Sequence, residues 1–376
     1  MKFKKTTLLI LGAIGISSFI YLQGCNQKPE NIKIGVVGSM SGINSDLSVS
    51  GRRGVELAVD EFNEAGGLDG KKIELVVKDD MNDATTALKI DKEFISENIP
   101  VVIGHYTSGM MVNSMAYLKD QDILFLSPTI SADSLSGIND NFIRFIATTR
   151  EQAIILADTA NKNNHKKFAV IYNLENTGFN EVFCTNFEDL LEKNHGEVIL
   201  TKTYTSSVDT NYSSLATELA GLKAEGLLII ASAADNAQIT QQLRKYGSSV
   251  QIYAPLWANT ADLVIKGGEA VEGMFLVGAI DINRKATDLE NFKTKYFNRY
   301  GENITFSAVY SYEATTSLFQ AMKMGPDLMP STIKSNLISM KNHKGLDGDY
   351  QIDAFGDNIR KYMIFKVMNG QLRRVD

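Results

Sequence analysis

The stretch that decides the fold covers residues 32–80 and reads IKIGVVGSMSGINSDLSVSGRRGVELAVDEFNEAGGLDGKKIELVVKDD. Residues 32–38 are a short, β-branched run of the kind that forms a buried strand. Residues 51–65 carry one apolar helix face, at spacings i, i+3, i+4 and i+7, formed by Val55, Ala58, Val59 and Phe62. Two glycines end this helix, and residues 73–78 are again strand-like. A strand, a helix and a second strand in this order predict a βαβ unit with parallel strands.

The same alternation continues along the rest of the chain. Further strands are expected at residues 101–104, 123–126, 168–172, 198–204, 227–231, 251–254 and 274–277. Helices are expected at residues 84–98, 109–119, 151–163, 179–194, 212–224, 236–246, 289–300, 308–323 and 331–340, and the tail is strand-like at 349–352, 362–367 and 371–375. The rhythm restarts after residues 142–146, which predicts two α/β lobes. Each is expected to be a doubly wound parallel sheet with helices on both faces, joined by short crossings.

The first 25 residues have the layout of a secretory signal peptide. Three lysines precede the apolar, uncharged residues 6–22, and the segment ends in Leu22-Gln23-Gly24-Cys25. This ending resembles the bacterial lipobox, whose cysteine becomes the lipid-modified first residue. A lipoprotein anchored at Cys25 is therefore predicted, while an uncleaved membrane anchor near the minimum spanning length and a soluble secreted form stay open. All three place residues 26–376 outside the cytoplasm.

The composition favours a two-domain globular protein that does not bind nucleic acid. Roughly 350 residues follow the signal segment, which exceeds one typical hydrophobic core. The net charge of −6 becomes −9 once the three signal-peptide lysines are removed. An acidic chain without a basic cluster cannot neutralise a phosphate backbone.

Tests for catalytic and metal-binding motifs are negative. Residues 35–42 follow a strand but lack the spacing of a dinucleotide loop, and residues 66–72 lack the P-loop pattern. Asp79-Asp80 is interpreted as a solvated turn or a helix start rather than a metal site. The four histidines are far apart, and Cys184 is expected to be a buried thiol in a helix. We therefore expect no enzyme activity, no metal and no cofactor.

Several segments together resemble a known family. Residues 32–80 do so with IPVVIGHYTSGMM at 99–111, DILFLSPTISADSL at 122–135, residues 256–259 and residues 312–314. They are similar to the leucine/isoleucine/valine-binding proteins, the type I periplasmic substrate-binding proteins of ABC importers. The resemblance covers nearly all of residues 32–370 and implies three hinge crossings, near residues 148, 281 and 350. It implies an N-terminal lobe of 32–148 plus 282–350, and a C-terminal lobe of 149–281 plus 351–376, after a tether at 26–31.

The resemblance also implies binding residues. Ser108, in the loop 104–108, matches the family serine that binds a ligand carboxylate. It precedes an apolar helix, so its hydroxyl and nearby free N–H groups can face an anion, although a plain helix cap stays open. The second family loop corresponds to Ser127–Ser131, in which Thr129, Ile130 and Ser131 are expected to contact the ligand. Leu47 and Thr177 fall where many members have aromatic residues.

Three departures from the family pattern bear on the ligand. Amino-acid binders hold the ammonium with an acidic residue just after strand 251–254, where this chain has Leu256 followed by its only tryptophan, Trp257. Asp235 and Asp281 are expected near the cleft mouth and are the candidates to replace that charge, because an unpaired buried ammonium is costly. Some members have a disulfide at the positions of Asn82 and Thr107, so here packing alone is expected to shape the site.

We therefore expect a lipid-anchored, monomeric solute-binding protein that closes on a small polar ligand and presents it to an ABC permease in the membrane. The family makes branched-chain or other apolar amino acids the first candidate ligands, followed by small carboxylates, aromatic acids and amides because of Leu256. Two alternatives stay open: a sensor that reports the ligand to a membrane partner, and an extracytoplasmic enzyme on the same scaffold.

Overall fold

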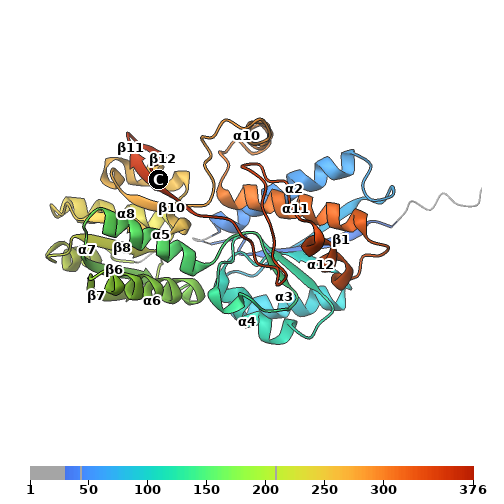
Figure 1. Ribbon diagram of the computed structural model, residues 1–376, viewed down its shortest axis with the longest axis horizontal. Helices are drawn as coiled ribbons and strands as arrows, with labels where there is room; N and C mark the ends of the chain where they lie inside the picture. The colour runs from blue at the N-terminus through green and yellow to red at the C-terminus, as the bar shows by residue number, and fades with distance from the viewer. Residues whose placement is uncertain (1–29, 43–44, 208–209) are drawn as a thin grey trace, which may run out of the picture.

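The computed structural model describes residues 30–42, 45–207 and 210–376. The expected signal peptide, Cys25 and most of the tether lie outside these residues. Two sheets form two lobes that lie side by side along the longest axis (Figure 1). The strand order is β2-β1-β3-β4-β5 in the first sheet and β12-β11-β10-β9-β8-β6-β7 in the second.

The first sheet is wholly parallel. It contains β1 (Ile32–Gly38), β2 (Ile73–Asp79), β3 (Val101–Ile103), β4 (Leu124–Ser127) and β5 (Phe142–Arg144). β1 and β2 pair in the predicted βαβ unit, with Val36 opposite Val77. Val36 packs in the core beneath α2 (Asp46–Glu64), α11 (Phe306–Met324) and α12 (Pro330–Ser339). Its neighbour Val37 points to the other face, against α3 (Ala84–Ser96) and α4 (Ser108–Leu118), because strand side chains alternate.

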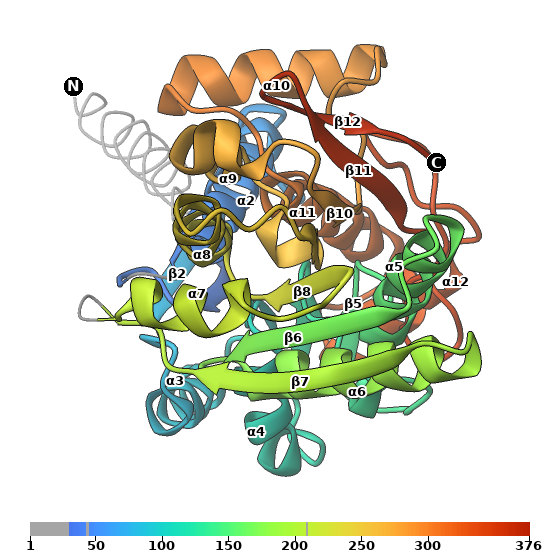
Figure 2. The same cartoon turned by 90° about the vertical axis from the view of Figure 1, so that its left-hand side faces the viewer.

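The second sheet is parallel from β7 to β10 and antiparallel beyond. It contains β6 (Lys167–Asn173), β7 (Glu197–Tyr204), β8 (Gly226–Ile230), β9 (Gln251–Ala254), β10 (Phe275–Gly278), β11 (Met363–Met368) and β12 (Gln371–Arg374). Helices α5 (Thr149–Lys162) and α6 (Thr177–Lys193) cover one face, and α7 (Tyr212–Ala220), α8 (Ala233–Lys245) and α9 (Ala261–Gly267) cover the other (Figure 2). The predicted pair of doubly wound α/β lobes is therefore confirmed.

Three predictions of elements need correction. Residues 349–352 form no strand and make only single bridges, Tyr350 to His343 and Ile352 to Asn358. The helix predicted from residue 51 begins earlier, at Asp46. Helix α9 was not predicted, because its seven residues are too few to show a helical period.

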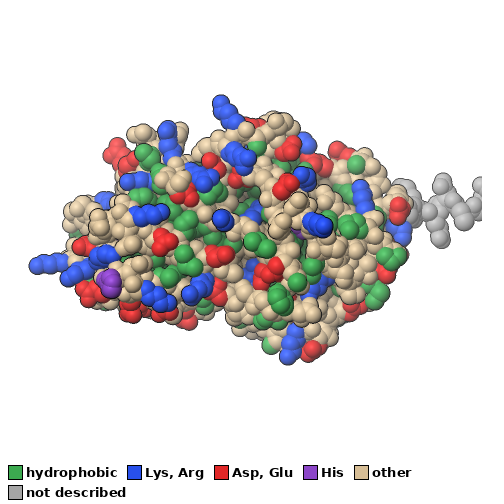
Figure 3. Space-filling model, viewed as in Figure 1, with side chains coloured by type: hydrophobic (Ala, Val, Ile, Leu, Met, Phe, Trp, Pro, Cys, Tyr) green, Lys and Arg blue, Asp and Glu red, His purple; other side chains and the backbone are tan. Residues whose placement is uncertain are grey.

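The chain passes between the sheets three times. It leaves the first sheet after β5, returns after β10 through α10 (Thr287–Tyr300) to α11, and crosses again between α12 and β11. The lobe boundaries at residues 148, 281 and 350 remain a prediction. Over the described ranges no helix is both long enough and apolar enough to cross a bilayer. On the face in Figure 3, acidic and basic side chains are interspersed, so this face offers no continuous positive track for phosphates.

Candidate functional site

A small cavity lies between the two lobes, where loops follow the carboxyl ends of strands, as expected for open α/β sheets. Its lining residues are Leu47, Tyr106, Ser108, Thr129, Ser131, Ile146, Gln152, Asn176, Phe179, Leu256, Trp257 and Phe306. The volume is about 30 Å3. This is room for no more than a few water molecules, so an organic ligand requires the lobes to move apart.

The loop between β3 and α4 contributes Ser108, which is 3% exposed. Ser108 is the first residue of α4, and Thr107 is the N-cap residue without a side-chain cap bond. Helix α4 has no side-chain cap hydrogen bond in the described structure, so the Ser108 hydroxyl is not consumed in capping. Hydroxyl and unpaired helical N–H groups therefore lie at one place, which suits an anionic ligand group.

The loop after β4 is tied to the Ser108 loop by hydroxyl groups. Ser127 Oγ donates to the carbonyl of His105 at 2.8 Å, and Thr129 Oγ1 donates to the carbonyl of Tyr106 at 2.6 Å. Ser131 Oγ lies 3.4 Å from the Gln152 Nε2 donor. These bonds fix the two loops relative to each other before a ligand arrives.

Opposing helix starts meet at the cavity. The backbone N–H of Gly109, in α4, donates to Asn176 Oδ1, just before α6, at 3.2 Å. A Cβ on Gly178 would lie 3.1 Å from the Gly109 nitrogen, so the two backbones are in close contact. In Figure 1, α4 and α6 lie beside each other at the lobe junction. The positive ends of two helix dipoles, one from each lobe, therefore face the same space.

The rest of the lining is apolar and largely aromatic. Leu47 and Phe306 come from the first lobe, and Phe179, Leu256 and Trp257 come from the second. Trp257 is 5% exposed, and its indole N–H is buried with no acceptor in the described structure. A buried donor without a partner costs about 1–3 kcal/mol, so a ligand acceptor beside it would be favourable.

A buried charged triad supports the Ser108 loop from behind. His105 Nδ1 lies 2.8 Å from Asp80 Oδ2, and His105 Nε2 lies 3.1 Å from Asp91 Oδ1. Each ring nitrogen faces a carboxylate oxygen, so both nitrogens donate, and the buried ring carries a positive charge. Hydrogen bonds to the two carboxylates outweigh the effect of burial and raise the pKa of His105 to about 9. The interpretation of Asp79-Asp80 as a solvated turn is wrong for Asp80.

Nearly all of the described part of the chain matches one family. The profile described as "Periplasmic binding protein" matches residues 31–371. The chain belongs to the periplasmic binding protein family. The predicted family resemblance is confirmed, and membership places the described residues outside the cytoplasm.

Individual relatives agree with this assignment. This periplasmic binding protein is 25% identical to the Leu/Ile/Val-binding protein homolog 3 of Brucella melitensis over 323 residues, which cover 84% of each chain. The crystal structure of a leucine-binding protein from Thermotoga maritima has a TM-score of 0.83 at 21% identity and covers 92% of this chain and 98% of its own. A solute-binding protein of an ABC transporter from R. palustris, in complex with benzoate, has a TM-score of 0.83 at 19% identity, covering 92% and 95%. These two structures establish the likeness of fold.

The structure brings together six of the residues singled out from the sequence: Leu47, Ser108, Thr129, Ser131, Leu256 and Trp257. Two others lie beside the cavity without lining it. Ile130 is fully buried in the core against α3 and α4. Thr177 is exposed at the first position of α6, and its neighbour Asn176 lines the cavity instead.

The two aspartates proposed to hold an ammonium group do not line the cavity of this periplasmic binding protein. Asp235 is 1% exposed, and its carboxylate is surrounded by hydroxyl donors from Tyr204, Ser206 and Tyr212. Asp281 accepts a hydrogen bond from the backbone N–H of Asn283 at 3.0 Å, in a turn at the second crossing. Both carboxylates therefore have structural partners away from the ligand.

The positions of the missing family disulfide are connected by polar contacts. Thr107 Oγ1 donates to Asn82 Oδ1 at 3.1 Å, and Asn82 Nδ2 donates to the carbonyl of Glu175 in the other lobe at 3.4 Å. The expectation that packing alone holds this part of the site is wrong. A side-chain bridge replaces the covalent link and also contacts the second lobe.

Sequence reasoning missed six lining residues: Tyr106, Ile146, Gln152, Asn176, Phe179 and Phe306. Asn176 immediately precedes the helix that follows β6, a position where a ligand-facing polar residue is expected in this fold. Gln152 gave no such signal, because it lies inside α5 and its role depends on partners from distant segments. Its Oε1 accepts from Leu256 N at 3.2 Å, and its Nε2 donates to Tyr362 Oη at 3.2 Å.

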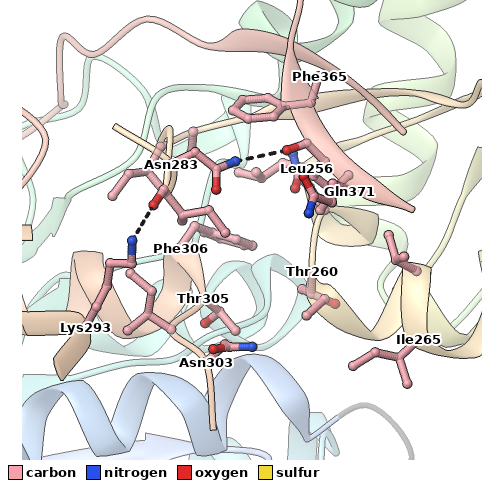
Figure 4. A pocket seen from close by; sticks show the side chains of 18 of the residues that line it. Leu256, Thr260, Ile265, Asn283, Lys293, Asn303, Thr305, Phe306, Phe365 and Gln371 are labelled. Atoms are coloured by element: carbon pink, nitrogen blue, oxygen red, sulfur yellow. Dashed lines mark hydrogen bonds between the residues drawn. The ribbon is translucent and has the colours of Figure 1, made fainter. Parts of the chain in front are cut away.

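A larger cavity of about 410 Å3 adjoins the first one on the side of the second crossing. Leu256 and Phe306 line both cavities and separate them. Figure 4 shows Thr260, Phe306 and Phe365 around this space, with the Lys293 ammonium bound to a backbone carbonyl at its edge.

Proposed function

We propose that the two lobes close on a small organic acid and deliver it to the permease of an ABC importer. The observation that carries this proposal is the shared cavity, to which both lobes contribute polar and apolar residues at their strand ends. The relatives support a carboxylate ligand, since leucine and benzoate both carry one. Amino acids and other small carboxylates are therefore both candidates.

Closure is proposed to be a shift between an open and a closed population. The Asn82–Glu175 and Gly109–Asn176 hydrogen bonds cross the lobe junction and exist only while the lobes are together. A ligand that touches both lobes binds the closed form better and shifts the equilibrium toward it. The small volume of the cavity implies that ligand entry requires opening.

We propose further that Cys25 carries a lipid, that residues 26–31 tether a monomer to the membrane, and that the protein binds its ligand without chemistry. The lobe boundaries near residues 148, 281 and 350 are the proposed hinges. A Cys25→Ser variant should move from the membrane fraction to the soluble fraction of cells. Retention in the membrane fraction would contradict lipid anchoring.

Trp257 makes the binding test simple, because it is the only tryptophan and it lines the cavity. Protein comprising residues 26–376 would be unfolded and refolded to remove bound ligand, and its tryptophan fluorescence would be recorded against amino acids, carboxylic acids and amides. A saturable change that disappears in Ser108→Ala supports the proposal. The absence of any such change contradicts it.

Uptake distinguishes an importer from a sensor. Cells that lack the protein should lose high-affinity uptake of the radiolabelled ligand and regain it when the gene is restored. Unchanged uptake, together with a lost transcriptional response to the same ligand, would favour the sensor.

A further inference from the structure

The ligand cavity has an unusual balance of hydrogen-bonding groups. In the described part of the chain, no Asp, Glu, Lys, Arg or His side chain lines it. The side-chain amide oxygens are already occupied, since Gln152 Oε1 accepts from Leu256 N and Asn176 Oδ1 accepts from Gly109 N. A ligand therefore meets no charged acceptor there, only hydroxyl groups and amide oxygens that already accept a hydrogen bond.

Each of the groups left without a partner at the cavity is able to donate a hydrogen bond. The Trp257 indole N–H is buried without an acceptor, and the Asn176 Nδ2 group and the Ser108 hydroxyl make no hydrogen bond within the described structure. Asn176 is 6% exposed and Ser108 is 3% exposed, so both lie in the cavity between the lobes and not on the open surface. Both lobes contribute to this set, since Ser108 begins α4 in the first lobe and Asn176 and Trp257 lie in loops of the second lobe.

The backbone also makes the electrostatic potential at the cavity more positive. Helix α4 has 11 residues and α6 has 17, and both begin at the cavity from opposite lobes. Two helix N-termini favour an anion and disfavour a cation placed between them. An ammonium group would lose its water here and find no carboxylate, which is expensive for a buried charge.

From these observations we infer that the ligand is an apolar carboxylic acid without an amino group, whose acceptor oxygens are bound from both lobes. The carboxylate lies between the starts of α4 and α6, and a second acceptor, such as a keto or hydroxyl oxygen, lies beside the indole N–H of Trp257. The apolar part packs against Leu47, Phe179 and Phe306. This inference rests on the proposed function and narrows its ligand class.

Series of acids that share a carbon skeleton and differ only in the group at the α-carbon test this ligand class directly. The stripped protein would be titrated with L-leucine, 4-methylpentanoate and 4-methyl-2-oxopentanoate, and with phenylalanine, 3-phenylpropanoate and phenylpyruvate, using Trp257 fluorescence and calorimetry. In at least one skeleton, the oxo acid should bind at least tenfold more tightly than the amino acid, because a neutral acceptor for the indole N–H replaces a buried unpaired ammonium.

One competing chemistry needs its own probe. Aromatic rings can hold a quaternary ammonium through cation–π contacts, and four of the lining residues are aromatic. Glycine betaine would test this case. Tighter binding of betaine or of an amino acid than of every amine-free acid would overturn the inference and leave the proposed function standing. Co-purification of an amino acid, identified by native mass spectrometry, would do the same, whereas a co-purified ligand that is not an acid would contradict the proposed function as well.

The Trp257→Phe variant tests the role of the indole N–H. It keeps an aromatic wall and should weaken binding of the oxo acid by about tenfold or more, while the ligand-free unfolding temperature stays equal or rises because a buried orphan donor is removed. Tyr253→Phe, in the same lobe and outside the cavity, is the control and should leave affinity unchanged. Unchanged affinity in Trp257→Phe would overturn the assignment of the second acceptor. If no small molecule binds the wild-type protein or co-purifies with it, the proposed function fails as well.

Discussion

The buried triad of His105, Asp80 and Asp91 makes the stability of this protein depend on pH in a specific window. The folded state raises the pKa of His105 from its ordinary value of 6.5 to about 9, because two carboxylates accept its N–H groups. A raised histidine pKa stabilises the fold fully below pH 6.5, and the stabilisation is lost as the pH rises toward 9. With 1.36 kcal/mol per pKa unit, the loss is about 3 kcal/mol, spread over this window.

The assay is urea unfolding of the ligand-free protein at pH 6, 7, 8, 9 and 9.5. Between pH 6.5 and 9 the free energy of unfolding should fall by about 1.4 kcal/mol per pH unit, the slope of one proton per molecule. The series is run in a Cys184→Ala background, because burial raises the thiol pKa of Cys184 from 9 to about 12, and the unfolded chain would otherwise lose this proton near pH 9 and add its own slope. The same series in His105→Gln should be flat in this window. The variant should also be about 3–5 kcal/mol less stable at pH 6.5, because two carboxylates stay buried without their cation.

A second buried histidine provides the control. His343 is also fully buried, but burial lowers its pKa, so it affects stability only as the pH falls below 6.5. His343→Gln should therefore keep the slope between pH 6.5 and 9. A wild-type stability that is equal at pH 6.5 and 9.5, or a slope that persists in His105→Gln, would refute the assignment of a charged His105.

Three further predictions use the site and the lobe core. Ser108→Ala should weaken ligand binding by tenfold or more in calorimetry. Ser114→Ala, which removes an unpaired buried hydroxyl from the same helix, is the control and should not weaken it. Equal effects of the two substitutions would contradict the role of Ser108. Arg360→Met should lower the urea-unfolding free energy by about 3–5 kcal/mol, because Glu313 is 1% exposed and would lose its cation; a loss below about 1 kcal/mol would contradict this. Leu256→Asp should increase amino-acid affinity, while Leu256→Asn should not; an equal response would show that the added charge does not reach the amine.

Local periodicity was enough to predict the parts of the fold that are local in sequence. Strand β1 alternates between two cores, with Val36 on one face and Val37 on the other, and the face of Val55, Ala58, Val59 and Phe62 packs as the spacing predicts. A βαβ unit contains its own partner strand within a short stretch of chain, so the pattern decides its pairing.

The C-terminal tail shows where this reasoning fails. Residues 363–368 pair antiparallel with β10, although nearly 90 residues separate them. Residues 349–352 have a similar strand-like composition but find no continuous partner, and only Tyr350 and Ile352 form single bridges. Strand formation depends on a neighbouring edge, and the sequence of the strand itself does not contain that information.

The acidic residues around the cleft show the same limit for the site, and they show why it matters for the ligand. The sequence has many carboxylates near the strand ends, and each of them has the charge needed to neutralise an ammonium group. The fold uses them elsewhere: Asp80 and Asp91 hold His105, and Asp235 is surrounded by hydroxyl donors. What remains at the cavity is a set of unpaired hydrogen-bond donors, which includes the Ser108 hydroxyl and the Trp257 indole N–H, together with the starts of helices α4 and α6. The charge that a ligand meets is therefore set by which side chains remain without partners after folding, and here that balance favours an anion without an amine.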